Sequence, residues 1–130
     1  MEFKAYKMDG LGNDFVIIER NKRNPISISK EKIIELGKRD NIGFDQMIFV
    51  EEDHVIPNHA SITIFNSDGD KVDACGNGSR CVAKILCDKT KKEYAVIETS
   101  NRILKAQKIS ENNIRPVSYT HLTLPTICSV

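Results

Sequence analysis

Cys75 stands where a helix is expected to begin, directly before Gly76, Asn77 and Gly78. The first backbone N–H groups of a helix have no partner inside the helix, and the helix dipole favours negative charge beside them. The same position can therefore hold a ligand carboxylate and favour a thiolate. Gly76 and Gly78 leave space beside the sulfur, and the Asn77 amide can both donate and accept hydrogen bonds. These residues make acid–base chemistry on a small carboxylate a candidate function.

Several readings of Cys75 are open. Nucleophilic catalysis usually needs a neighbouring base such as histidine, and none is near Cys75 in the sequence. General acid–base catalysis needs only a correctly placed thiol of matched pKa. A thiol redox role is weakened because Cys75 has no partner at C-x-x-C spacing. The structural alternative is a buried cysteine at a glycine-rich helix start.

Cys75, Cys81 and Cys87 are spaced six residues apart, which raises the question of a metal site. On a helix, six residues correspond to about 600° of rotation, so successive thiols point in different directions. They cannot converge on one ion in the way that close-set zinc ligands do. No metal is expected, and Cys81 and Cys87 are predicted to be small buried residues of a core helix.

Charge and hydropathy weigh against several classes of function. The chain has 130 residues and a formal net charge of +1, so binding to nucleic acid or to an anionic membrane has no electrostatic support. The first residues lack a signal-peptide pattern, and no apolar run approaches the ~20 residues that span a bilayer. We therefore expect a cytoplasmic location, free thiols and no membrane partner.

Apolar periodicity predicts the elements that position these residues. Strands are expected over 3–8, 15–18, 47–50, 60–65, 94–98 and 103–108, and helices from the cap at 29 to about 39 and over 76–88. Ser29 is expected to cap the first helix, with Ile28 and Ile33 as a hydrophobic staple. A pattern rich in strands with two helices indicates an α+β fold in which strands wrap or cover a helix.

The end of the chain differs in composition from the rest. Residues 117–130 contain no charged side chain, and they resemble the translated adaptor sequence that sometimes ends fragmentary genes. We therefore predict a domain over residues 1–114 followed by a non-native tail over residues 115–130. A genuine C-terminal strand is the alternative.

Several separated motifs resemble the diaminopimelate epimerase family in order and spacing. They are Gly10-Leu11-Gly12-Asn13-Asp14-Phe15, Asp45-Gln46, Phe65-Asn66-Ser67-Asp68-Gly69 and Cys75-Gly76-Asn77-Gly78-Ser79-Arg80-Cys81. The resemblance implies strands wrapped as a barrel-like sheet around a central helix, as in the N-terminal domain of that family. It also implies a cofactor-independent (PLP-independent) isomerase of lysine and peptidoglycan biosynthesis, which interconverts LL- and meso-diaminopimelate.

The resemblance also implies residue roles. Cys75 would be one of two catalytic cysteines, which act as thiolate and thiol on opposite faces of the substrate α-carbon. Gly76 and Asn77 would donate hydrogen bonds to the α-carboxylate. The remaining substrate-binding positions in this half would be the amides of Asn13, Gln46 and Asn66.

The family's second domain, with its partner cysteine, has no counterpart in this sequence. We therefore predict an N-terminal half that does not epimerise alone, and whose uncovered apolar wall would favour aggregation or a homodimer. Alternatives are a proline racemase-like enzyme, an epimerase of another amino acid, and a non-catalytic carboxylate-binding module.

Overall fold

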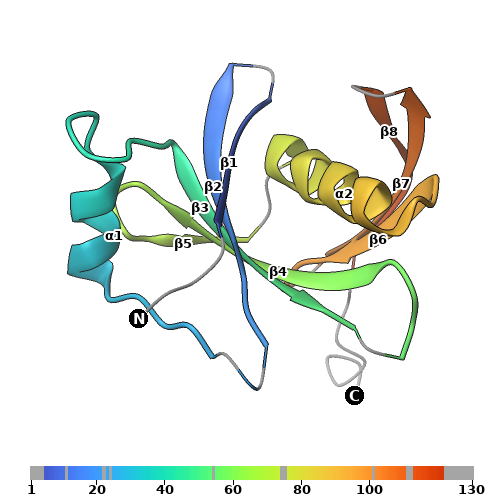
Figure 1. Ribbon diagram of the computed structural model, residues 1–130, viewed down its shortest axis with the longest axis horizontal. Helices are drawn as coiled ribbons and strands as arrows, with labels where there is room; N and C mark the ends of the chain where they lie inside the picture. Colours follow the sequence, from blue (N-terminus) through green and yellow to red (C-terminus); the bar gives the residue numbers. More distant parts are fainter. Residues whose placement is uncertain are drawn as a thin grey trace.

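The computed structural model describes residues 5–10, 12–21, 23, 25–53, 55–73, 76–100, 102–110 and 113–121 (Figure 1). The strands are β1 (Ala5–Gly10), β2 (Asn13–Glu19), β3 (Gln46–Glu52), β4 (His59–Asn66), β5 (Lys71–Val72), β6 (Tyr94–Glu98), β7 (Arg102–Ser110) and β8 (Asn113–His121). The helices are α1 (Lys30–Gly37) and α2 (Gly76–Thr90).

These strands form one mixed sheet, in the order β1-β2-β3-β4-β6-β7-β8 with β5 paired to β4. The β2–β3 and β4–β6 pairs are parallel, and the other pairs are antiparallel. The sheet curls, so that β1 and β8 approach α2 from opposite sides (Figure 1). The arrangement is a half-barrel around one helix, which confirms the predicted α+β fold class.

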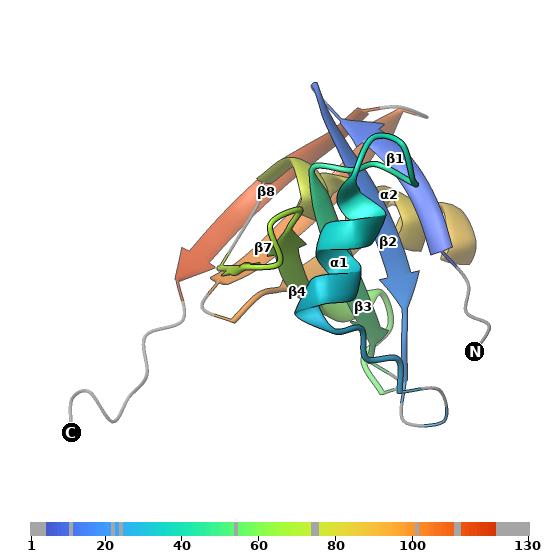
Figure 2. The ribbon, with the colours of Figure 1, turned by 90° about the vertical axis from the view of Figure 1, so that its left-hand side faces the viewer.

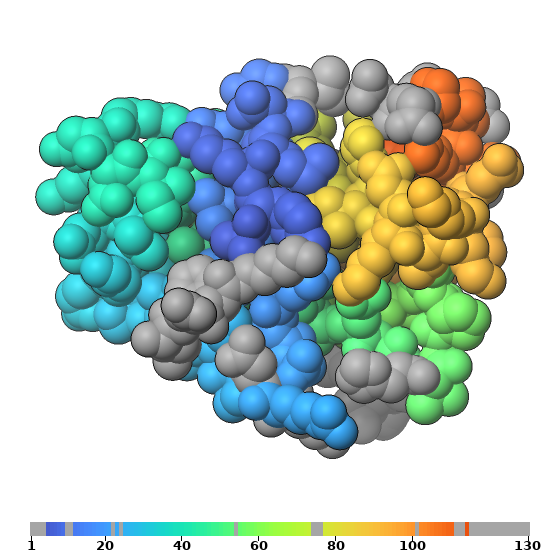
Figure 3. All heavy atoms as spheres, in the orientation of Figure 1, coloured from blue at the N-terminus to red at the C-terminus, as the bar shows by residue number. Residues whose placement is uncertain are grey.

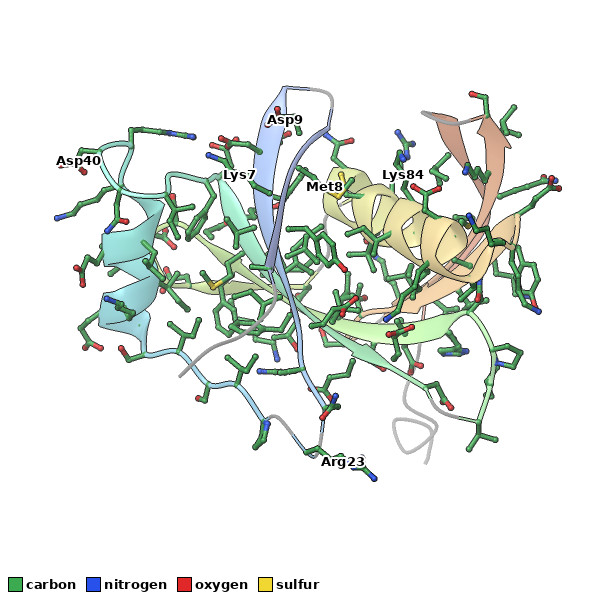
Figure 4. The ribbon with its side chains drawn as sticks, viewed as in Figure 1. Lys7, Met8, Asp9, Arg23, Asp40 and Lys84 are labelled. Carbon is green, nitrogen blue, oxygen red and sulfur yellow. The ribbon has the colours of Figure 1, made fainter. Side chains whose placement is uncertain are left out.

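The inner core lies between α2 and the concave face of the sheet. On α2 the side chains of Cys81, Val82 and Leu86 are buried, as their helical spacing predicts. They pack against alternate residues of the strands, including Phe15 of β2. Met8 of β1 points toward the first turns of α2 (Figure 4) and is partly buried against this core. The sheet covers α2 incompletely, because atoms of the helix reach the surface between β1 and β7 (Figure 3).

A second core lies on the opposite face of β2 and β3, under α1 (Figure 2). Phe44, Met47 and Phe49 are buried there. Both faces of β2 and β3 are thus covered, which explains why each strand reads as a continuous apolar run. At the start of α1, Ser29 accepts a hydrogen bond from the Lys32 backbone N–H, as predicted for its cap.

Most element boundaries differ from the sequence prediction by a few residues, and four differences are larger or change the extent of the sheet. Helix α1 ends at Gly37 rather than near residue 39, because the backbone turns extended at Lys38, whereas α2 continues to Thr90. The predicted 103–108 strand is longer at both ends, since it pairs along its length with β6 and β8. The backbone of Asn113–His121 forms β8, so strand pairing continues past residue 114. The non-native origin of residues 115–130 stays a prediction.

Candidate functional site

Three of the predicted amide residues lie at one end of the sheet. Asn13 begins β2, Gln46 begins β3 and Asn66 ends β4. Because β2 and β3 are parallel while β4 runs the opposite way, these three termini meet at the same end. In register, Gln46 lies opposite Phe15 on one side and Asn66 on the other.

Side-chain hydrogen bonds join these amides in two pairs. The Gln46 Nε2 donates to Asn66 Oδ1 at 3.0 Å. The Asn77 Nδ2, in the first turn of α2, donates to Asn13 Oδ1 at 3.2 Å, across 64 positions of sequence. The start of the central helix is therefore tied to the same end of the sheet as the three amides. The structure thus brings together residues that the sequence analysis selected from four separate segments.

One atom of this group has no hydrogen-bond partner among the described residues. The Gln46 Oε1 is buried and makes no hydrogen bond within the described part of the chain. A buried acceptor without a donor is unfavourable by about 1–3 kcal/mol. An N–H group is the kind of donor that this amide oxygen can accept from.

The N-terminus of α2 has electrostatics that favour an anion. The helix begins at Gly76, and no acidic residue occupies its first turn. The N–H groups at a helix start and the helix dipole carry partial positive charge, which no acidic side chain of this first turn offsets. Cys75, the predicted catalytic residue, lies outside the described residues. Cys81 and Cys87 are buried and are not in a disulfide, which confirms their prediction as small core residues, and burial raises the pKa of the Cys87 thiol.

Two carboxylates and a guanidinium brace the strand ends beside the amides. Arg39 Nη1 and Nη2 donate to Asp14 Oδ2 and Oδ1 at 2.6 and 3.2 Å, and Nη2 also donates to Asp45 Oδ1 at 3.0 Å. The Arg39 hydrogen bonds lower the pKa of Asp14 to about 2. Sequence reasoning assigned these residues no role. The available signal was an aspartate beside an amide twice, in Asn13-Asp14 and Asp45-Gln46.

Other polar groups of the described residues suggest no further chemistry. His59 Nε2 lies 3.2 Å from Glu98 Oε2 in a pair on the β4–β6 surface, away from the amides. Among the residues that the structure describes, no three His, Cys, Asp or Glu side chains gather as metal ligands would. Neither α1 nor α2, the helices of the described chain, is long and apolar enough to cross a membrane.

The fold recurs in solved structures. The chain aligns with a phenazine biosynthesis protein of the PhzF family from Enterococcus faecalis at a TM-score of 0.63 and 15% identity, covering 85% of this chain and 42% of that one. A protein described as a predicted epimerase from Pseudomonas aeruginosa aligns at a TM-score of 0.62 and 11% identity, over 87% of this chain and 41% of that one. The curled sheet around a helix is therefore a fold that this chain shares with both proteins.

Sequence comparison then gives the family. The family model for diaminopimelate epimerase matches residues 5–120. Diaminopimelate epimerase from Pelagibacter ubique is 43% identical over 114 residues, which cover 88% of this chain and 40% of the relative. The protein of the same name from Chromobacterium violaceum is 38% identical over 118 residues, covering 88% of this chain and 42% of the relative. The chain belongs to the diaminopimelate epimerase family, and it spans about two fifths of the length of these relatives.

Proposed function

We propose that this chain supplies the N-terminal half of a cofactor-independent epimerase that interconverts LL- and meso-diaminopimelate. The observation that carries the proposal is the Asn77–Asn13 hydrogen bond, which joins the N-terminus of α2 to the end of the sheet where the three amide residues lie. This junction puts donors for a carboxylate next to amides for the other polar groups of an amino acid. Family membership supports the choice of substrate.

Inversion at an α-carbon requires removal of its proton from one face and delivery of a proton to the other. We assign one of these tasks to Cys75, whose thiolate would take the proton or whose thiol would give it. The α-proton beside a carboxylate is weakly acidic, so donors placed at the developing charge must stabilise it. We assign this task to the backbone N–H groups of Gly76 and Asn77, because α2 begins at Gly76 and the first N–H groups of a helix have no acceptor within the helix.

The amides would orient the substrate. Asn13, Gln46 and Asn66 offer both donors and acceptors at one end of the sheet, which suits a ligand carrying ammonium and carboxylate groups. The Gln46 Oε1, which has no donor among the described residues, supports an ammonium in particular, because an ammonium has donors and no acceptor.

The opposite face of the α-carbon needs a second acid–base group. Within the described residues the cysteines are Cys81 and Cys87, and both are buried in the core. We therefore assign the partner group to a second domain, with residues 1–114 as the first domain and residues 115–130 as a non-native tail. Resequencing the gene across the codons near Ile114 tests this division, because a reading frame that continues into a second Cys-Gly motif would supply the missing half.

We propose the cytoplasm as the place of action, because Cys81 and Cys87 are not in a disulfide and reduced cysteines persist in a reducing compartment. Where the second half is absent, we propose that the uncovered cleft wall favours association between copies, as an apolar surface does. Analytical ultracentrifugation of the purified chain at several concentrations would measure this association.

The 130-residue chain alone is expected to show no epimerase activity. Purified chain would be incubated with LL-diaminopimelate, and the meso product would be followed by chiral chromatography. The expected rate equals that of a blank without protein, because the chain provides an acid–base group on only one face of the α-carbon. Clear turnover would contradict the assignment of the second acid–base group to another domain.

Replacing Asn77 by alanine is expected to weaken binding of LL-diaminopimelate to the chain about 2–10-fold. The substitution removes the hydrogen bond that holds the Asn13 amide in place, and a neutral hydrogen bond contributes about 0.5–1.5 kcal/mol. Alanine is a strong helix former, so α2 itself should persist. Chemical-shift titration of the isotope-labelled chain measures the affinity. Lys84→Ala, on the same helix but outside the site, is the control and should bind like the unmodified chain. Equal affinities for all three proteins would overturn the placement of the ligand.

A further inference from the structure

We propose that Asp14, Arg39 and Asp45, here called the Asp14–Arg39–Asp45 cluster, position the amide side chains of Asn13 and Gln46. The inference rests on the proposed function, because only a ligand-binding role makes the placement of these amides matter. The cluster members are positioning residues. Asp14 and Asp45 act through the amide residues next to them in the chain, and Arg39 acts through its hydrogen bonds to these two carboxylates. Asp14 follows Asn13 directly, and Asp45 directly precedes Gln46.

Reciprocal hydrogen bonds hold the first residues of β2 and β3 together. The Asp14 backbone N–H donates to Asp45 Oδ2 at 2.9 Å. The Asp45 backbone N–H lies within hydrogen-bond distance of both Asp14 Oδ1, at 3.0 Å, and the Asp14 carbonyl oxygen, at 2.9 Å. Each side chain thus caps the backbone of the other strand, one residue away from an amide of the site. Two strand ends that could fray are fixed relative to each other.

The same backbone carries the third amide. The Ser67 N–H donates to the Asp45 carbonyl oxygen at 3.1 Å, which fixes the chain directly after Asn66. A turn follows, in which the Gly69 N–H donates to the Asn66 carbonyl oxygen at 2.9 Å. The Asp45 backbone therefore links the ends of β2, β3 and β4. A shift of Asp45 would move all three amide positions together.

Arg39 makes the close approach of two carboxylates favourable. Asp14 and Asp45 would repel each other without a cation between them. The planar guanidinium contacts both, and its bidentate contact with Asp14 adds directional specificity that a lysine ammonium lacks. The Asp14 side chain is largely shielded, with 18% exposed, so the pair is less screened than a fully solvated one.

Other charged groups also face Asp14 and belong in any account of its titration. On β1, Lys7 Nζ lies 3.9 Å from Asp14 Oδ2, and Asp9 stands opposite Asp14 in the strand register. Arg39, from the loop after α1, and Asp45, at the start of β3, complete the set. Arg39 gives the largest lowering of the Asp14 pKa.

The experiment compares the isotope-labelled, ligand-free chain with its Arg39→Gln variant and records the side-chain amide resonances of Asn13 and Gln46. In Arg39→Gln these resonances are expected to move or broaden, and the pKa of Asp14 is expected to rise from about 2 toward 3.8. Because the pKa of the folded form is lowered, the ionised Asp14 stabilises the fold above about pH 3.8, and this contribution is lost as the pH falls through 2. The pH at which the amide resonances shift, as Asp14 becomes protonated, should therefore be higher in the variant.

Lys89→Gln is a matched control. Lys89 also bridges carboxylates of β2 and β3, contacting Glu19 and Glu52 at 3.5 and 2.7 Å, but at the other end of these strands. The Lys89→Gln substitution should leave the Asn13 and Gln46 resonances unchanged even if it lowers the stability of the chain. If Arg39→Gln does not fold, Arg39→Lys takes its place. Lysine retains the positive charge but not the two parallel N–H donors of the guanidinium, so the amide resonances should shift by a smaller amount.

The inference is overturned if the Asn13 and Gln46 resonances of the folded Arg39 variant coincide with those of the unmodified chain. It is also overturned if Lys89→Gln displaces them equally, because the effect would then reflect general loosening. These readouts need no ligand. Failure of LL-diaminopimelate to bind would contradict the proposed function and leave the positioning result intact, whereas unmoved amides would contradict the positioning role even if the ligand binds.

Discussion

Replacing Phe44 by alanine is expected to lower the free energy of unfolding by about 3–5 kcal/mol. Phe44 is 1% exposed and belongs to the core between α1 and the outer face of β2 and β3. Its ring lies close to Gly37 at the end of the helix, where a Cβ would meet Phe44 Cζ at 3.3 Å. Alanine would leave a cavity where α1 meets the sheet, and α1, of only 8 residues, has little stability of its own with which to close it.

Urea unfolding, followed by circular dichroism, measures the loss for Phe44→Ala as a lower midpoint at unchanged slope. Ile42→Ala is the control from the same loop, because Ile42 is 46% exposed and its change should stay within about 0.5 kcal/mol. Should Phe44→Ala not fold, Phe44→Leu retains most of the packing and should show a smaller loss. A loss of less than about 1 kcal/mol for the alanine variant would mean that α1 is not held by this core.

The second large effect is expected in the inner core, where Leu86→Ala should lower the free energy of unfolding by about 2–5 kcal/mol. Leu86 is 2% exposed on the face of α2 that packs against the sheet. Side chains from several strands pack against this face of α2, so a cavity at Leu86 weakens contacts with several strands at once. The cost is highest where the surroundings cannot collapse, and a sheet held by ladder hydrogen bonds moves little.

Thermal and urea unfolding of Leu86→Ala are measured against Lys84→Ala, a matched variant from the solvent side of the same helix. Lys84 forms an ion pair with Asp88 at 2.7 Å, and loss of such an i,i+4 pair costs about 0.3–0.5 kcal/mol. A large difference between the two variants is expected. Equal losses would show that α2 is not the centre of the inner core.

Local features of the fold can be read from the chain because their causes are local. The Ser29 cap depends on a hydroxyl three residues before a backbone N–H, and it forms as predicted. The apolar stripe of α2 and the alternation of β4 follow from the 3.6- and 2-residue periods of their backbones. The glycines and Asn77 likewise mark a helix start, and α2 begins at Gly76.

Strand order and the contacts across it were decided by the tertiary structure. The sequence predicted strands without showing that β2 pairs in parallel with β3, or β4 with β6, because pairing joins segments through long connections. The Asn77–Asn13 contact spans 64 positions, and Arg39 reaches Asp14 across 25. Such contacts depend on how the sheet curls around α2. Residue types and spacing therefore predict which side chains and N–H groups could hold a carboxylate. The fold establishes which of the described ones lie together, because proximity between distant residues is set by packing rather than by any local preference.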